Sequence, residues 1–172
     1  MVVLKIQIIG YSGSGKSTLA KILGDYYKIP YLHLDNVQFY GDWQIRSKEE
    51  QNNIVNKFLD ENENWVIDGN YSIVGSRRFE ESDITIFLNY NRFFCYRMCK
   101  KRYKMYKNSS RESCPCKEKF DYGFRFWILF SGRTKKRRER HIINLNKTKG
   151  EKIIFKNRNE LNNWLKNCAI ID

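Results

Sequence analysis

A glycine-rich turn near the start of the chain holds the residues whose types and spacing most clearly predict chemistry. The stretch GYSGSGKSTLA, residues 10–20, has the order G-x-x-x-x-G-K-S between an apolar run and a helical pattern. In this setting the pattern is a phosphate-binding loop, because glycines let main-chain N–H groups point inward and the helix start adds further donors. Lys16 can reach the outer phosphates, and the Ser17 hydroxyl can ligate magnesium. The sequence therefore predicts a site for ATP with Mg²⁺, formed by Gly10, Ser12, Gly13, Ser14, Gly15, Lys16, Ser17 and Thr18.

Two carboxylates close later apolar runs and are candidates for metal and substrate binding. Asp68 ends the run WVID and could hold magnesium, directly or through water, or could be a turn residue before Gly69. Asp35 ends the run IPYLHLD and could orient an acceptor hydroxyl or take its proton. It could equally cap a helix or be a second magnesium holder. Because a phosphate acceptor is already anionic and needs no base, Asp35 favours a hydroxyl acceptor.

Alternating apolar runs and helical patterns predict the elements that position these residues. Apolar runs predict five strands at 4–9, 29–35, 65–71, 83–90 and 152–156. Helical patterns predict helices at about 15–27, 47–63, 91–107, 120–130, 132–147 and 157–167, with an exposed loop at 108–119. The alternation favours an α/β fold of three layers, α/β/α, with a five-stranded parallel sheet between helices. Ligands of such sheets bind at the carboxyl ends of the strands, where Gly10, Asp35 and Asp68 are expected.

Length and composition limit the classes of protein that remain. A chain of 172 residues fits one domain. It has no apolar run of 18 residues, so no membrane span is expected, and its first residues resemble a strand more than a signal peptide, which predicts a cytoplasmic location. The cysteines should then be reduced. The spacing of Cys114 and Cys116 is tighter than that of common zinc sites, which disfavours zinc and leaves metal binding by this pair open.

The positive charge of the chain is concentrated in one segment. Residues 92–140 contain 17 Lys or Arg and 4 Asp or Glu, so this segment carries the whole net charge of +13. Such a segment should meet nucleotide phosphates, a nucleic acid backbone, or both. Aromatic residues interleave with the basic ones, as suits stacking on single strands. An alternative to an enzyme is therefore a nucleic-acid-binding ATPase or regulator that affects DNA topology.

Five motifs together resemble one family. WVIDGNY resembles the strand and D-G turn of adenylate kinases, and HLD resembles the substrate aspartate of shikimate- and gluconate-type kinases. A closer resemblance, to the bacterial DNA topology modulation protein family, spans IIGYSGSGKSTLA, YLHLDNVQF, WVIDGNYS, FLNYNRF and GRTKKRRERH. That family consists of adenylate kinase-like P-loop ATPases or kinases within the nucleoside monophosphate kinase-type superfamily.

The resemblance implies a single P-loop kinase-like domain with a helical lid. The core would comprise about 1–35, 64–98 and 140–172, with an acceptor-binding insertion at about 36–63 and a basic lid at about 100–135. The implied activity is transfer of the γ-phosphoryl group of Mg-ATP to a small acceptor, by a protein that is expected to be a monomer. The acceptor, and the choice of ATP over GTP, are not readable from the sequence.

The resemblance also assigns roles to residues outside the phosphate-binding loop. Arg77 and Arg78 would grip the acceptor, and Asn157 and Arg158 would contact adenine. Phe39, in an aromatic-rich loop, could stack on a base, line the acceptor pocket or pack in the core. Lys16 and Asp35 would be catalytic together with lid arginines that act as arginine fingers supplied in cis, for which the candidates are Arg97, Arg102, Arg133 and Arg137.

Overall fold

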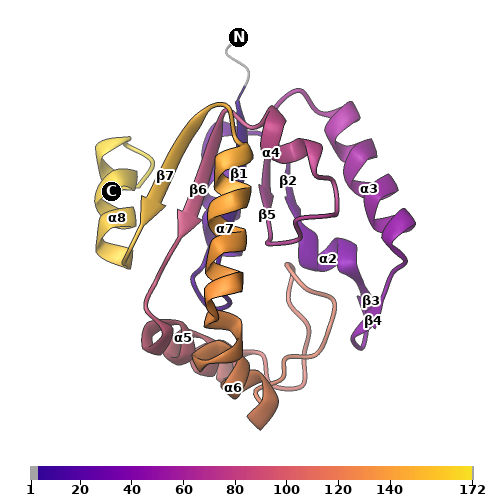
Figure 1. Cartoon of the computed structure of the whole chain (residues 1–172), viewed down its shortest axis with the longest axis vertical. Helices are drawn as coiled ribbons and strands as arrows, with labels where there is room; N and C mark the ends of the chain where they lie inside the picture. The colour runs from indigo at the N-terminus through magenta and orange to yellow at the C-terminus, as the bar shows by residue number, and fades with distance from the viewer. Residues whose placement is uncertain (1–3, 172) are drawn as a thin grey trace.

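Five parallel strands form the central sheet of the molecule (Figure 1). The computed structural model describes residues 4–171. The strand order is β2-β5-β1-β6-β7, so β1 lies in the middle, with β5 on one side and β6 on the other. The bounds of these strands are Lys5–Gly10 (β1), Tyr31–His33 (β2), Trp65–Asp68 (β5), Ile84–Leu88 (β6) and Glu151–Phe155 (β7).

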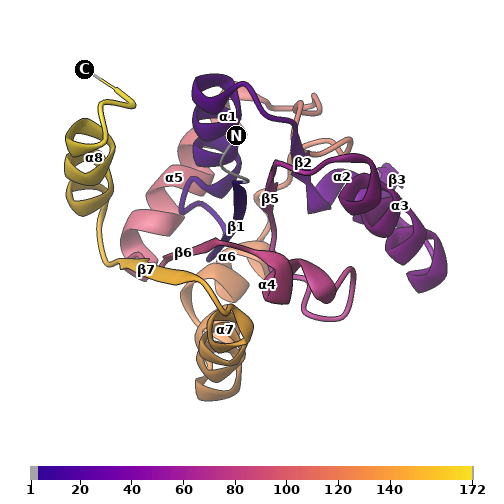
Figure 2. The same cartoon turned by 90° about the horizontal axis from the view of Figure 1, so that it is seen from above.

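Helices cover both faces of the sheet and give the three-layer α/β/α architecture that the sequence predicts. Seen from above in Figure 2, α1 and α8 lie on one face, and α4 and α7 lie on the other. The bounds of the longer helices are Lys16–Tyr27 (α1), Lys48–Glu61 (α3), Arg92–Met105 (α5), Tyr122–Leu129 (α6), Lys135–Lys147 (α7) and Arg158–Asn167 (α8). The short ones are Leu34–Gln38 (α2), Arg77–Glu81 (α4) and the 3₁₀ turn Ser131–Arg133 (η1).

The hydrophobic core has two parts that fix the sheet in place. The larger part packs β1 and β6 against α1 and α5, through side chains such as Ile8, Leu23 and Ile86. The smaller part packs α3 against β5, through Val55 and Trp65. Because apolar burial is the main favourable term in folding, these contacts hold the carboxyl ends of β1 and β5 side by side.

Asp35 does not end a strand, which corrects the sequence prediction. Strand β2 stops at His33, and Asp35 lies in the first turn of α2. The helix forms because Leu34 and Val37, three residues apart, are both buried, and a helical turn is what brings such a pair onto one face. After α2 the chain forms a small antiparallel hairpin, β3 (Phe39–Gly41) with β4 (Gln44–Ile45).

The segment between α5 and α6 is less exposed than its composition predicts. Figure 1 shows this loop reaching from α5 toward α2 and the β3–β4 hairpin. Cys114 and Cys116 are buried, and the Trp43 main-chain N–H donates to Cys116 Sγ at 3.2 Å. Within residues 4–171, no helix is both long enough and apolar enough to cross a membrane.

Candidate active site

The phosphate-binding loop joins β1 to α1 and leaves its donors open. Gly13 has φ +78°, and a β-carbon there would collide with the Cys95 carbonyl and lie 2.7 Å from Cys99 Sγ. Gly15, at φ +93°, is the N-cap of α1 and offers no side-chain cap, so the N–H groups of the first turn stay free for an anion. Lys16 Nζ donates to the Tyr11 carbonyl at 3.2 Å, which keeps the lysine folded over the loop.

A second turn pins the end of β1. The Gly10 N–H donates to Asn70 Oδ1 at 3.0 Å, and Asn70 Nδ2 donates back to the Gly10 carbonyl at 2.6 Å. These two hydrogen bonds join the exit of β1 to the turn after β5. These bonds fix the exit of β1 next to the turn that follows Asp68.

Asp68 lies where a magnesium ion beside bound phosphates would be held. The Ser17 hydroxyl donates to Asp68 Oδ2 at 2.9 Å, and the other carboxylate oxygen contacts His33 Nδ1. Hydroxyl and carboxylate oxygens suit Mg²⁺, which usually takes only one or two protein carboxylates and completes its shell with phosphates and water. The donor set therefore fits the predicted ion, with Ser17 as a direct ligand and Asp68 as a direct or water-mediated one.

Asp35 lies in the same cleft, with a partner of its own. The Tyr71 hydroxyl donates to Asp35 Oδ1 at 2.7 Å, and burial together with the Asp35 charge raises the pKa of Tyr71. Burial lowers the pKa of Lys16, while the charges of Asp68 and Asp35 act in the opposite direction. Both carboxylates are thus within electrostatic reach of the lysine.

A cleft of about 1430 Å³ runs along the carboxyl ends of the strands and brings most predicted residues together. Phe39 reaches it and packs edge-on against Trp43, with ring centroids 5.2 Å apart. The predicted residues that line this cleft are Ser12, Gly13, Ser14, Gly15, Lys16, Ser17, Thr18, Asp35, Phe39, Asp68, Arg102, Arg137 and Arg158.

The loop between α5 and α6 forms the wall opposite the phosphate-binding loop. We call residues 107–119 the facing loop. Glu112 ties it to the core: its carboxylate pairs with Lys21 at 3.0 Å and accepts from the Tyr31 hydroxyl at 2.8 Å. Asn36 Nδ2 donates to the Glu112 carbonyl at 2.7 Å, one residue from Asp35. The facing loop therefore borders both the phosphate side and the acceptor side of the cleft.

Two of the four predicted lid arginines do not line the cleft. Arg97 is exposed on α5. The Arg133 guanidinium stacks on the Tyr11 ring, 3.4 Å from its centroid, and Nη1 donates to the Tyr90 carbonyl at 2.7 Å. Arg133 therefore contacts the phosphate-binding loop through the Tyr11 ring, on a side that does not line the cleft. Asn157, predicted near adenine, caps α8 by accepting from the Glu160 N–H.

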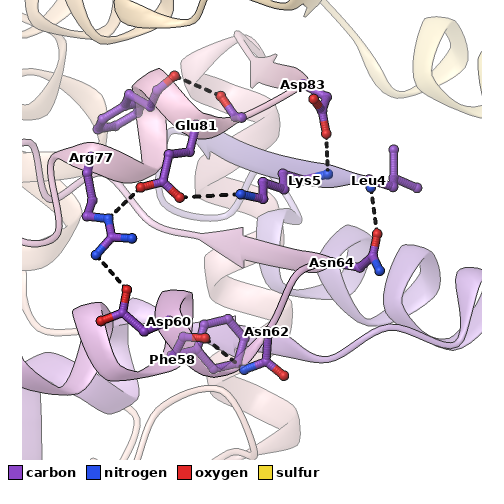
Figure 3. Close-up of polar contacts among 11 residues, drawn as sticks. Leu4, Lys5, Phe58, Asp60, Asn62, Asn64, Arg77, Glu81 and Asp83 are labelled. Carbon is purple, nitrogen blue, oxygen red and sulfur yellow. Dashed lines mark hydrogen bonds and ion pairs between the residues drawn. The ribbon is translucent and has the colours of Figure 1, made fainter. Parts of the chain in front are cut away.

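Arg77 and Arg78 are also outside the cleft, which corrects their assignment to the acceptor. Figure 3 shows Arg77 between Asp60 of α3 and Glu81 of α4, near Lys5 at the start of β1 and so at the opposite edge of the sheet. Arg78 is fully buried and donates to main-chain carbonyls, including that of Tyr71 at 2.5 Å. Burial lowers the pKa of Arg78 to about 9. Both arginines act in the fold, because Arg77 pairs with two carboxylates and the terminal nitrogens of Arg78 donate to main-chain carbonyls.

Sequence reasoning missed four residues of the cleft. His33 is buried, and its partner is the carboxylate of Asp68. Tyr71 lies only three residues after Asp68, which was a usable signal. Arg111 and Glu118 had no such signal, because their pairing depends on how an irregular loop folds back. Within residues 4–171, no group of three or more His, Cys, Asp or Glu side chains could hold a metal, so the Cys114–Cys116 pair gains no support as a zinc site.

Comparison with solved structures places the fold among P-loop kinases. A shikimate kinase from Bacteroides thetaiotaomicron aligns with TM-score 0.55 and 16% identity over 96% of this chain and 96% of that chain. A deoxyadenosine kinase from M. mycoides aligns with TM-score 0.51 and 14% identity over 98% and 100%. An uncharacterized protein from Eubacterium ventriosum gives TM-score 0.51 and 15% identity over 97% and 98%.

No family model matches the chain, and no curated protein matches it. The resemblance to DNA topology modulation proteins therefore stays a prediction. At the identities above, the structural likeness shows the fold of P-loop kinases and leaves the substrate to be argued from the cleft.

Proposed function

We propose that the protein is a phosphotransferase that moves the γ-phosphoryl group of Mg-ATP to a hydroxyl group of a small acceptor. The observation that carries this proposal is the presence of two separate carboxylates in one cleft with Lys16. Asp68 is next to Ser17, where magnesium would be held. Asp35 has a different partner, Tyr71, and stays available for an acceptor.

The position of Asp35 favours a hydroxyl acceptor over a phosphate acceptor. A carboxylate near the attacking group helps a neutral hydroxyl, because it can accept the proton as the new bond to phosphorus forms. The same carboxylate would repel the phosphate of a nucleoside monophosphate. The Tyr71 hydrogen bond holds one oxygen of Asp35 and leaves the other to accept from the substrate.

The similar solved structures support the same class of acceptor. Their names describe kinases of shikimate and of deoxyadenosine, two compounds that carry hydroxyl groups and no phosphate. The cleft volume of about 1430 Å³ exceeds the roughly 300–1,000 Å³ of a typical pocket for one ligand, so the cleft has room for a nucleotide and a small acceptor together. Phe39 and Trp43, which pack edge-on, supply apolar ring surface on the acceptor side that could contact a ring of the substrate.

The test is phosphate transfer from labelled Mg-ATP to two panels of acceptors. One panel contains sugars, nucleosides and hydroxy acids, and the other contains nucleoside monophosphates. We expect transfer to a member of the first panel only, with loss of about 10³-fold or more in the Lys16→Ala variant. Asp35→Asn should lower transfer by about 10²–10⁴-fold while Mg-ATP affinity stays within about 2-fold. Transfer to a monophosphate that survives Asp35→Asn would refute the assignment of a hydroxyl acceptor.

A second candidate function is binding of single-stranded nucleic acid. One observation favours it: Tyr122, Phe126 and Phe130 form an exposed ladder along α6, with successive ring centroids 6.4 and 5.1 Å apart. Exposed rings in a strongly basic segment suit base stacking. Binding of an oligonucleotide at physiological salt, with a steep salt dependence and weakened by Phe126→Ala, would support this function. If no oligonucleotide binds at physiological salt, this second candidate function is refuted.

A further inference from the structure

Glu118 is a buried carboxylate in the facing loop that contacts two arginines at once. Its side chain is 4% exposed. Arg102 Nε lies 3.1 Å from Glu118 Oε1, and Arg111 Nε lies 2.5 Å from the same oxygen. Removing a carboxylate from water is costly unless cations compensate it, so this cluster has a definite geometry rather than a solvated one. It keeps one net positive charge.

The main chain fixes Glu118 from the other side. The Glu118 N–H donates to the Ser109 carbonyl at 3.1 Å. Arg111 and Cys114 exchange two main-chain hydrogen bonds, of 3.0 and 3.1 Å, which close the facing loop into a tight turn. The carboxylate therefore sits on a segment held by main-chain hydrogen bonds, and both guanidinium groups lie within ion-pair distance of it.

The two guanidinium groups keep donors available for a ligand. Each Nε lies within ion-pair distance of the carboxylate but forms no aligned hydrogen bond with it. Among the described residues, no protein acceptor occupies the terminal nitrogens of Arg102. Arg111 uses Nη1 on the Ser113 hydroxyl at 2.7 Å. Arg102, Arg111 and Glu118 all line the cleft that contains the phosphate-binding loop. The charge of Arg102 also contributes to lowering the pKa of Lys16, which places this arginine within electrostatic reach of the predicted phosphates.

We propose that Glu118 is a positioning residue that holds Arg102 and Arg111 as a preformed clamp for the terminal phosphoryl group of the nucleotide. This inference rests on the proposed function, since it concerns the group that would be transferred. A fixed guanidinium fork binds phosphate oxygens more strongly than a mobile one, because its orientation costs no further entropy on binding. The clamp contacts the third phosphate and leaves the first two to the main-chain N–H groups around Gly13 and Gly15.

The experiment compares Mg²⁺ complexes of AMP-PNP and ADP, which differ in the terminal phosphoryl group, by titration calorimetry. Wild-type protein is expected to bind AMP-PNP more tightly than ADP. Glu118→Gln is expected to weaken AMP-PNP by about 10-fold and ADP by less than about 2-fold. The matched control is Glu81→Gln, a carboxylate that also pairs with an arginine, Arg77, but lies outside the cleft, and it should leave both affinities unchanged. Equal losses for both nucleotides, or no loss, would overturn the clamp.

A second pair of variants covers the case in which Glu118→Gln fails to fold. Arg102→Lys and Arg111→Lys keep the positive charge that balances Glu118 but lack the fork. Each should reduce the preference for AMP-PNP over ADP while the melting temperature stays within a few degrees, and an unchanged preference in both would refute the proposal. No acceptor is needed for this readout. Failure of the acceptor panels with an intact AMP-PNP preference would therefore count against the proposed function and not against the clamp.

Discussion

The two walls of the cleft are held in place by different means. The phosphate-binding loop, residues 10–18, owes its shape to the main chain: Gly13 and Gly15 have positive φ, and Gly10 is pinned by Asn70. The facing loop depends on side chains, chiefly the buried Glu118 with its two arginines, to which Glu112 adds an exposed pair with Lys21. A wall made by the main chain is sensitive to added atoms where a glycine packs closely, as Gly13 does, whereas a wall made by ion pairs depends on charge.

The largest effect is expected from adding one methyl group to the first wall. Gly13→Ala would push a β-carbon into the Cys95 carbonyl at a φ that side chains rarely adopt. Backbone strain and overpacking together should cost about 2–5 kcal/mol of unfolding free energy. Urea unfolding of the nucleotide-free protein measures this loss.

Gly15→Ala is the matched control for that substitution. It shares the positive φ, but its β-carbon would meet no atom within 4 Å. Only the strain remains, about 1 kcal/mol. If the two variants lose equal stability, close packing of Gly13 against α5 does not shape the phosphate-binding loop.

The sequence predicts the phosphate-binding loop but not the contacts of the facing loop, because only the first is formed by residues close together in the chain. The glycines, Lys16 and Ser17 are local, so their spacing alone predicts the loop, and the apolar runs predict all five strands around it. Arg111 and Glu118 meet through an irregular loop, which has no period to read. Asp35 lines the cleft, but its predicted position at a strand end is wrong, because burial of Leu34 and Val37 starts a helix there.

The ion pair of Arg77 with Glu81 follows from a local spacing in the sequence. The i,i+4 spacing of the two residues on a helix predicts an ion pair, and the structure has it (Figure 3). Family resemblance instead placed Arg77 at the acceptor. Local spacing was the better guide here, since a guanidinium already paired with two carboxylates has little left to offer a substrate.

A pH-dependent loss of stability, of intermediate size, is expected from His141, which packs against Tyr11 of the phosphate-binding loop. His141 packs edge-on against Tyr11, with ring centroids 5.0 Å apart, and stacks on Phe87. Burial, with the charges of Lys16 and Arg133 next, lowers the pKa of His141 to about 4. In the unfolded chain the pKa of His141 has its ordinary value near 6.5, so on acidification the unfolded chain binds the proton first. The free energy of unfolding is therefore unaffected by His141 above about pH 6.5 and decreases as the pH falls toward 4.

The loss between these two pH values should be on the order of 3 kcal/mol in the wild-type protein. His141→Phe keeps an aromatic ring and removes the titrating group, so its stability should fall less over the same range. Parallel pH profiles of unfolding free energy for the two proteins would show that His141 does not carry the acid sensitivity. Carboxylates that titrate in this range affect both proteins alike and cancel in the comparison.

The smallest effect is expected from the exposed ion pair of the second wall. Glu112→Gln removes the charge that pairs with Lys21, while the Glu112 carbonyl still accepts from Asn36. An exposed pair is well screened by water and salt, so the melting temperature should change by about 2 °C or less, and by still less at about 1 M salt. A shift several times larger, and independent of salt, would mean that the surface pair holds the facing loop. Glu118 would then lose its place as the residue on which this wall depends, because the loop would be anchored at its rim on the core and not at its buried arginines.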